Sequence, residues 1–401
     1  MKNKINVLFL GCFYPPSYLE NILKNSRKKC QFAADKLQWS LIDGFIQNHV
    51  NLELLSFPTI STYPVGYKKI YFKGGDFVYK DFKGYCSSFL NLPFIKFING
   101  DLSMRIKRWY SSTNGEKCLF VYSLQVNLMR EAIEMKKTLP NLHLCIIIPD
   151  LPEYMGCNKY YKMFGFRKKE IDYIYKNINQ FDSYVLLSKH MAEKLNIQHL
   201  KHTVVEGIFS GEIQSPPQKT NYNEKIILYT GNINRRYGIK ELIDAFMQIT
   251  APEYRLWIRG DGEMMKYVIE KSKIDVRIKY FAKMTQEDLT LLQQRATLLI
   301  NPISNKEEIT KYFFPSKTME YLASGIPTLM YKLECLPQEY NDYLYFIYND
   351  DINGIKEAII KNCEKSPMEL EMFARRASNF IRRYKNPRLQ VLKILNVINS
   401  N

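Results

Sequence analysis

The chain of 401 residues is longer than a single hydrophobic core usually supports, so two domains are expected. Its 46% apolar and 24% charged residues describe a globular protein and exclude a disordered or low-complexity chain. The formal net charge of +17 indicates an acidic partner. Because no nucleic-acid-binding motif accompanies this charge, we expect an anionic membrane surface or a phosphorylated substrate, and no nucleic acid.

Short apolar runs in the N-terminal half alternate with helical patterns. Their hydrophobicity is continuous, which is typical of parallel strands covered on both faces by helices. The first run is predicted to be a strand rather than a signal peptide, and no run is long enough to span a membrane. A cytoplasmic protein is therefore expected. The predicted strands occupy residues 5–10, 51–57, 117–123, 142–150 and 183–188.

The eight cysteines are scattered, and none has the spacing of a metal site. We expect reduced thiols, no metal and no cofactor.

The stretch 66–110 is the densest mixture of basic and aromatic residues in the chain. Lysine and arginine alternate there with tyrosine, phenylalanine and tryptophan, a pattern that suits a surface resting on lipid headgroups. A loop-rich subdomain with a solvated basic face explains the same pattern. The first alternative predicts peripheral binding to the inner face of the cell membrane.

The strand–helix alternation starts again at residue 225, after a segment rich in Pro, Ser, Asn and Gln. The sequence therefore predicts two tandem, Rossmann-like, doubly wound α/β domains. Ligands of such sheets bind outside the carboxyl ends of the strands. The predicted domains are residues 1–210 and 211–380, each of which could hold one substrate, and a C-terminal helix at 381–401 that packs back on the first domain.

The segment "FPSKTMEYLASGIP" follows the strand "TLLINPI". Pro315 and Ser316 are expected to begin a helix whose N-terminus binds an anion. Lys317 would add a positive charge, and Glu320 would accept hydrogen bonds from ribose hydroxyls. An ordinary solvated ion pair between Lys317 and Glu320 is the alternative. The position at a strand's carboxyl end favours a binding site.

The segment "YTGNINRRYGIKEL" holds a second candidate group. Gly231 and Asn232 end a buried strand, where a glycine lets the backbone approach a ligand. Arg235 and Arg236 follow and could clamp a diphosphate, although solvated residues at a helix entry fit as well. Gly260 ends the next strand and either forms a structural turn or lines the same pocket.

Asp150 ends an apolar strand of the first domain. Its carboxylate could hydrogen-bond a sugar or act as a base. The prolines around it equally allow a rigid turn that Asp150 caps.

In this order and spacing, the segments 229–246, 256–263, 291–303 and 314–330 resemble the retaining glycosyltransferases of the GT-B fold, family four (glycosyl transferases group 1). The resemblance implies a nucleotide-sugar donor in the C-terminal domain, an acceptor in the N-terminal domain and no obligatory metal. It also implies that Glu320 binds the donor ribose and that Lys317 faces the diphosphate.

Three positions depart from the pattern of that family. Tyr312 stands where a first glutamate is common, so this carboxylate is missing or displaced to Glu307 or Glu308. Asn232 and Tyr237 occupy positions where arginine and lysine are common, and Arg235 or Arg236 takes over their charge.

The sequence predicts a hexosyltransferase that moves a sugar from a nucleoside-diphosphate donor to a glycan or polyprenyl-linked acceptor in bacterial surface polysaccharide synthesis. One alternative is a nucleotide-sugar epimerase, which needs no acceptor. The other is a basic scaffold protein with a decayed cleft, which would bind no nucleotide.

Overall fold

The computed structural model describes residues 5–93, 95–96, 101–156, 165–211 and 223–399. Its chain forms two compact units. Unit 1 comprises Met1–Ile208 and Pro387–Asn401, and unit 2 comprises Phe209–Asn386.

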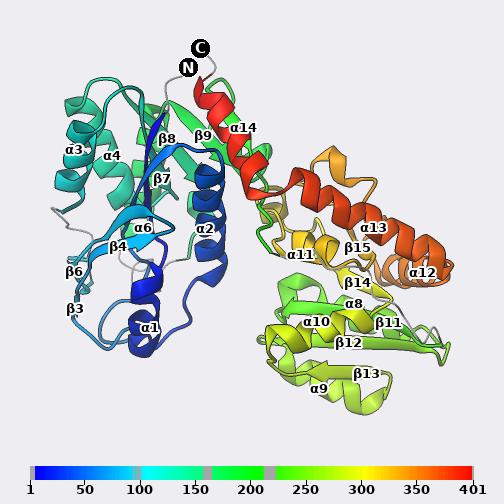
Figure 1. Ribbon diagram of the computed structural model, residues 1–401. Coiled ribbons are helices and arrows are strands. Elements are labelled where there is room, and N and C mark those ends of the chain that lie inside the picture. The colour runs from blue at the N-terminus through cyan, green and yellow to red at the C-terminus, as the bar shows by residue number, and fades with distance from the viewer. Residues whose placement is uncertain (1–4, 94, 97–100, 157–164, 212–222, 400–401) are drawn as a thin grey trace. The chain divides into compact units, whose positions relative to one another are not determined.

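The return of the chain to unit 1 lies at a different residue from the one that the sequence suggests. The predicted boundary at 380/381 falls inside α13 (Pro367–Tyr384). That helix starts with a capping box between Ser366 and Glu369 and continues without a break to Tyr384. The chain therefore leaves unit 2 only where α14 (Pro387–Asn399) begins (Figure 1).

Unit 1 is built on an eight-stranded sheet with the order β10-β9-β8-β7-β1-β2-β5-β4. All neighbours in it are parallel except β4 and β5, which pair as an antiparallel hairpin at one edge. The strands are β1 (Asn6–Gly11), β2 (Asn51–Ser56), β4 (Gly75–Tyr79), β5 (Phe82–Cys86), β7 (Lys117–Tyr122), β8 (Leu142–Ile148), β9 (Ser183–Leu186) and β10 (His202–Val204).

Helices follow most of these strands, as the alternating pattern predicts. A small antiparallel pair, β3 (Tyr71–Phe72) with β6 (Phe89–Leu90), lies outside the main sheet. The stretch 66–110 thus contains short strands and a helix as well as loops. The helices of unit 1 are α1 (Pro16–Asn25), α2 (Phe32–Gln47), α3 (Asp101–Ser112), α4 (Val126–Thr138), α6 (Phe166–Asn177), α7 (His190–Lys194) and α14, with short 3-10 turns at Pro152–Tyr154 and Ile178–Gln180.

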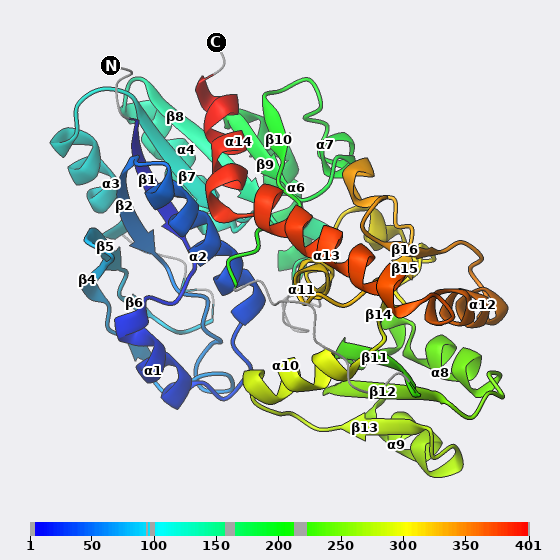
Figure 2. The same ribbon diagram turned by 45° about the vertical axis from the view of Figure 1, so that its right-hand side comes forward.

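Unit 2 has a six-stranded, entirely parallel sheet with the order β13-β12-β11-β14-β15-β16 (Figure 2). Its strands are β11 (Lys225–Asn232), β12 (Tyr254–Asp261), β13 (Ile278–Phe281), β14 (Leu298–Asn301), β15 (Thr328–Tyr331) and β16 (Tyr345–Ile347). Its helices are α8 (Ile239–Met247), α9 (Met265–Ile274), α10 (Gln286–Arg295), α11 (Lys317–Ala323), α12 (Ile352–Cys363) and α13, with 3-10 turns at Arg235–Tyr237, Glu308–Lys311 and Gln338–Tyr340.

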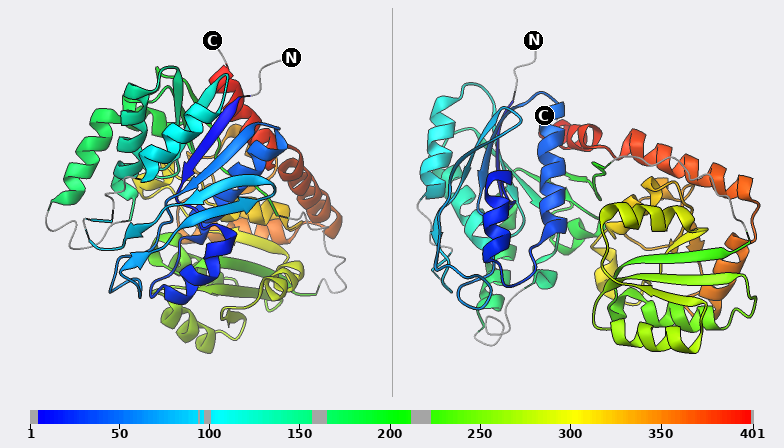
Figure 3. Two further views of the ribbon diagram at one scale, coloured as in Figure 1. Left: turned by 60° about the vertical axis from the view of Figure 1, so that its left-hand side comes forward. Right: turned by 60° about the horizontal axis from the view of Figure 1, so that its bottom comes forward.

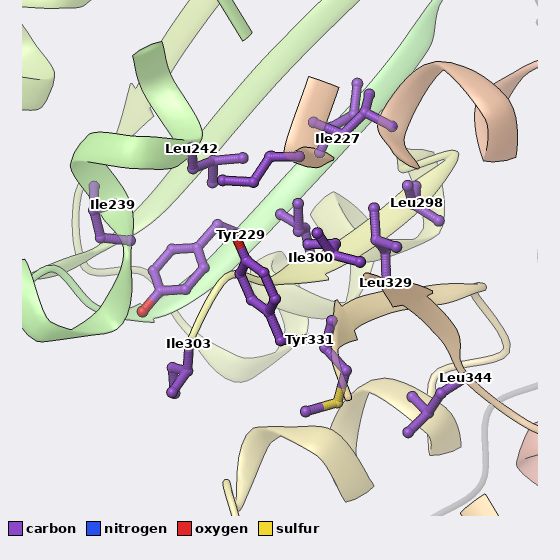
Figure 4. Close-up of a cluster of buried hydrophobic side chains, with 14 of the residues drawn as sticks. Ile227, Tyr229, Ile239, Leu242, Leu298, Ile300, Ile303, Leu329, Tyr331 and Leu344 are labelled. Atoms are coloured by element: carbon purple, nitrogen blue, oxygen red, sulfur yellow. The ribbon is translucent and has the colours of Figure 1, made fainter. Parts of the chain in front are cut away.

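The core of unit 2 lies between the strands and the helices that cover them. Leu298 and Ile300 of β14 and Leu329 of β15 meet Leu242 of α8 in one buried cluster (Figure 4). The continuous apolar runs of the sequence are therefore strands inside a covered sheet. Two doubly wound α/β units, each with strands side by side in the further views of Figure 3, confirm the predicted fold class.

The packing of α14 on α2 depends on a glycine. A Cβ atom on Gly44 of α2 would lie 2.3 Å from Val391 Cγ2 and 2.5 Å from the backbone oxygen of Pro387. The amide of Asn48 also donates a hydrogen bond of 2.8 Å to the carbonyl of Arg388. The two helices are therefore in close contact at Gly44.

Replacing Gly44 by alanine tests this contact. Alanine is favoured over glycine by about 1 kcal/mol in an exposed helix, but here overpacking should destabilise unit 1 by about 1–3 kcal/mol. Hydrogen exchange of the α2 and α14 peptides measures the effect. Gly156→Ala is the control, because among the described residues other than its chain neighbours no atom lies within 4 Å of its added Cβ. Greater protection in Gly44→Ala than in the wild type would contradict the close packing.

Candidate functional site

The ends of two central strands of unit 2 meet at a pair of glycines. Gly231 of β11 lies opposite Gly260 of β12, and Asn232 lies opposite Asp261. A Cβ atom on Gly260 would lie 1.8 Å from the carbonyl oxygen of Gly231, so only glycine fits there. The structure thus brings three of the predicted binding residues together, with Asn232 exposed at the edge of the sheet.

The loop after β11 presents both predicted arginines to solvent. The backbone N–H of Arg235 donates to Glu263 Oε1 at 3.0 Å, which ties the loop to the turn after β12. The guanidinium of Arg236 donates to the Tyr237 hydroxyl at 3.0 Å and lies over that ring. Gly238 ends the loop with φ of 72°, a left-handed conformation that favours glycine.

Helix α11 carries the predicted ion pair. Lys317 Nζ lies 2.7 Å from Glu320 Oε2, and about a third of each side chain is exposed. The helix begins at Lys317, with Ser316 as the exposed residue that precedes it, and Gly325 closes it with φ of 75°. With only seven residues, α11 has a weak dipole, so side-chain charge matters more here than the helix end.

A tyrosine that the sequence analysis did not single out fixes α11 against the sheet. The backbone N–H of Thr230 donates to the Tyr321 hydroxyl at 2.8 Å, and this hydroxyl lies 2.9 Å from the Thr230 carbonyl oxygen. Burial raises the pKa of Tyr321 to about 12, so it remains a neutral donor. Because Thr230 adjoins Gly231 and Tyr321 adjoins Glu320, this contact joins the two predicted groups into one locus.

Two further polar groups lie near this locus. The hydroxyl of Tyr312 donates to Glu308 Oε1 at 2.8 Å, so Tyr312 holds Glu308 rather than Glu307. Asn301, at the carboxyl end of β14, is buried, and its Nδ2 has no hydrogen-bond partner among the described residues. No local signal in the sequence marks Asn301, since the residue simply ends an apolar strand.

Unit 1 contains a pocket of about 560 Å³ at the carboxyl ends of its strands. Asp150, the predicted residue after β8, lines it. Asp150 reaches solvent, yet desolvation by the surrounding protein raises the pKa of its carboxyl above its ordinary value. Most of the other lining residues come from the segments that follow β1, β2 and β7, from the start of α4 and from the segment before α6, and α2 and α6 contribute Ala34, Arg167 and Glu170.

Lys96 also lines this pocket, although the sequence analysis did not select it. Its side chain is only 6% exposed, and its ammonium donates to the carbonyl of Ile60. Burial lowers the pKa of Lys96 to about 8. Such a group stands out only in the fold, because the sequence around it resembles the rest of a basic stretch.

Three polar atoms in the pocket wall have no hydrogen-bond partner among the described residues. They are the Tyr122 hydroxyl, Ser123 Oγ and Asn127 Nδ2. Each such buried group costs about 1–3 kcal/mol when unsatisfied. Ser123 also has φ of 72°, which is uncommon for a residue with a side chain. Backbone conformations of this uncommon kind cluster at functional sites.

Asp35 of α2 contacts the segment that follows β1. The backbone N–H of Tyr14 donates to Asp35 Oδ1 at 2.7 Å. Burial raises the pKa of Asp35 to about 6.

In the described ranges, no three His, Cys, Asp or Glu side chains come together in a metal-binding arrangement. The same ranges hold no helix that combines the length and the apolarity needed to cross a membrane.

Comparisons with known proteins identify the class. Residues 211–380 match the family model described as glycosyl transferases group 1. No curated sequence matches the chain significantly.

Solved structures share the fold along nearly the whole chain. Sucrose-phosphate synthase from Thermosynechococcus elongatus is 12% identical with a TM-score of 0.63, covering 98% of both chains. The lipopolysaccharide outer core galactosyltransferase WaaB is 16% identical with a TM-score of 0.63, covering 98% of this chain and 99% of that one. Anabaena HepE in complex with UDP is 12% identical with a TM-score of 0.61, covering 99% and 100%.

The two α/β sheets share the GT-B fold of these solved structures along nearly the whole chain. Residues 211–380 are a glycosyl transferases group 1 domain, which confirms the resemblance carried by the sequence motifs.

The pKa of Asp35 predicts how stability depends on pH. The pKa is about 6 in the folded state against 3.8 for the ordinary group. As pH rises, the folded state therefore keeps the carboxyl proton to a higher pH than the unfolded state does. Stability should therefore fall as pH rises from about 4 to 6, and the loss should persist at pH 7. Asp35→Asn should stabilise the protein by about 1–2 kcal/mol at pH 7 and by little at pH 4.

Urea unfolding of both proteins at the two pH values measures this difference. Asp172→Asn is the matched control, because Asp172 is exposed on α6. An equal shift at pH 4 and pH 7 would show that the change in stability does not come from ionisation.

Proposed function

We propose that this glycosyltransferase moves a hexose from a nucleoside-diphosphate sugar to a glycan or polyprenyl-linked acceptor during bacterial surface polysaccharide synthesis. The observation that carries the donor part is the locus where Tyr321 ties α11 to the end of β11. This locus belongs to the same unit as the carboxylate of Glu320, the ammonium of Lys317 and the two glycines at the ends of β11 and β12. Similarity to a lipopolysaccharide outer core galactosyltransferase and to HepE in complex with UDP supports the reaction class and the setting.

The donor would be held by groups of unit 2 with separate roles. The carboxylate of Glu320 accepts hydrogen bonds from the ribose hydroxyls. Lys317, Arg235 and Arg236 balance the charge of the diphosphate, which grows as this group leaves. Because the contact between Lys317 and Glu320 is partly solvated, a ligand can replace it at little cost.

Backbone access completes this proposed donor site. Gly231 and Gly260 themselves carry no side chain at this edge, Asn232 ends the same strand as Gly231, and Asn232 and Ser316 are exposed polar residues.

Asp150 is the proposed acceptor residue of unit 1. A carboxyl with a raised pKa can receive a proton from a sugar hydroxyl or orient that hydroxyl by a hydrogen bond. In line with the resembled family, the hydroxyl replaces the diphosphate on the same face of the anomeric carbon.

Calorimetric titration with UDP, GDP and ADP tests the donor site. We expect one nucleoside diphosphate to bind selectively and Glu320→Ala to weaken it by about tenfold or more, since two ribose hydrogen bonds are lost. Glu357→Ala, which changes an exposed glutamate of α12, should bind like the wild type. Unchanged affinity in Glu320→Ala would remove Glu320 from the site. Failure of the wild type to bind any nucleotide would instead favour the scaffold alternative.

A surface of unit 1 supports peripheral membrane binding. We name it the basic-apolar patch, formed by the end of α1, the loop before β3 and the pair β3–β6. The backbone N–H of Arg27 donates to the carbonyl of Gly66 at 2.9 Å, which joins the first two segments. Exposed apolar and basic side chains alternate on it, namely Leu23, Val65, Ile70, Tyr71 and Leu90 with Lys24, Arg27, Lys28, Lys68, Lys69 and Lys73.

The charge and the apolar area of this patch are complementary to an anionic lipid surface. Each basic residue close to such a surface contributes about 1 kcal/mol, and the apolar side chains can enter the headgroup region. Attachment at the cytoplasmic face of the cell membrane would bring the enzyme to a polyprenyl-linked acceptor.

Sedimentation with liposomes tests the patch. The protein should pellet with vesicles that contain anionic lipid at low salt and be released at high salt, because salt screens the exposed charges. Lys68→Glu, Lys69→Glu and Lys73→Glu together should abolish pelleting. The same exchange at Lys137, Lys176 and Lys194, three exposed lysines of α4, α6 and α7, should preserve it. Membrane binding by the basic-apolar patch would be excluded if pelleting did not depend on anionic lipid, or if the triple patch variant pelleted like the wild type.

A further inference from the structure

The N-terminus of α4 borders the pocket of unit 1. Leu124, Gln125, Val126 and Asn127 all line it. The helix has thirteen residues, no side chain caps its N-terminus and no acidic residue lies in its first turn. Backbone N–H groups at such a helix start have no partner within the helix and favour a bound anion.

Side chains beside this helix start also have unused donors. Tyr122 and Ser123 are 1% and 7% exposed, and neither hydroxyl has a hydrogen-bond partner among the described residues. Asn127 Nδ2, in the first turn of α4, is buried and likewise without a partner there. Three independent side chains in one wall therefore point to a ligand that accepts hydrogen bonds.

The charged residues that line the pocket favour an anion at this end. Lys96 is buried, and Arg130 lies one turn after Asn127 on α4. The acidic side chains are Asp150 and Glu170, of which Glu170 pairs with Arg167 at 3.2 Å. The pocket lining therefore contains three basic side chains, Lys96, Arg130 and Arg167, and two acidic ones, Asp150 and Glu170.

We propose that Lys96, Asn127, Arg130 and the start of α4 form an oxyanion subsite, so that the acceptor sugar carries a phosphate or carboxylate group. This inference rests on the proposed acceptor role of unit 1. The oxyanion anchors the acceptor, and Asp150 is left to meet one of its hydroxyls.

The chemistry of the donors distinguishes an anion from a neutral sugar. An ammonium, an amide Nδ2 and backbone N–H groups donate only, whereas a sugar hydroxyl both donates and accepts. A phosphate or carboxylate accepts at every oxygen and suits donor-only partners. The volume of about 560 Å³ is sufficient for a sugar with such a group.

Calorimetry of the full chain with glucose 6-phosphate, glucuronate and glucose tests the subsite, with the nucleoside diphosphate selected by the donor titration kept saturating so that unit 2 is occupied. We expect one of the two anionic sugars to bind and glucose to bind about tenfold more weakly or not at all. Preference for glucose 6-phosphate assigns the subsite to a phosphate, and preference for glucuronate assigns it to a carboxylate. Equal binding of all three, or binding of none, would overturn the proposal.

Two variants locate the binding within the pocket. Lys96→Met removes the buried charge with an apolar side chain of similar length. Asn127→Asp places a carboxylate in the first turn of α4, where acidic residues stabilise a helix, so this variant should fold. Both variants should lower the affinity for the anionic sugar by about tenfold or more. Lys107→Met, an exposed lysine of α3, is the control.

The same samples separate this inference from the donor site. If the selected nucleotide still binds and the anionic sugar binds equally to Lys96→Met, Asn127→Asp and the wild type, the subsite is wrong while the donor site stands. Failure of UDP, GDP and ADP alike to bind the wild type would instead refute the proposed donor site, and the anionic sugar titration would then be repeated without nucleotide.

Discussion

The parallel alignment of the strands is the constraint on which the functional part of this protein depends. Parallel strands bring all their carboxyl ends to one edge of a sheet, so residues far apart in the chain gather there. In unit 2 the edge joins Gly231 and Gly260, to which Tyr321 ties α11 through Thr230, and in unit 1 it joins the pocket residues that include Asp150. Covering helices bury the strands themselves, which leaves this edge open for chemistry.

The two units hold charge in different ways. Lys317 and Glu320 share a partly solvated contact, whose strength is limited by water and by salt. Lys96 is removed from water, and its buried ammonium contacts the carbonyl of Ile60. A solvated pair exchanges readily for a ligand, whereas a desolvated cation gains strongly from an anion that enters its pocket.

The sequence predicted much of the architecture because the relevant signals are local. Continuous apolar runs predicted the central strands, which the structure shows inside covered sheets. The three-residue spacing of Lys317 and Glu320 placed them on one helix face, where they are in contact. The hairpin β4–β5 was missed, because its alternation of basic and aromatic residues resembles a solvated or lipid-facing loop.

The sequence by itself determined the fold class, the strand ends and the family of the C-terminal unit, since periodicity and motif spacing act over short stretches of chain. Only the tertiary structure decided which of those residues meet. Tyr321 reaches Thr230 across 91 positions, and Lys96 reaches Ile60 across 36. Such partners depend on how the helices pack and on which groups lose water, and no local pattern in the sequence records either property.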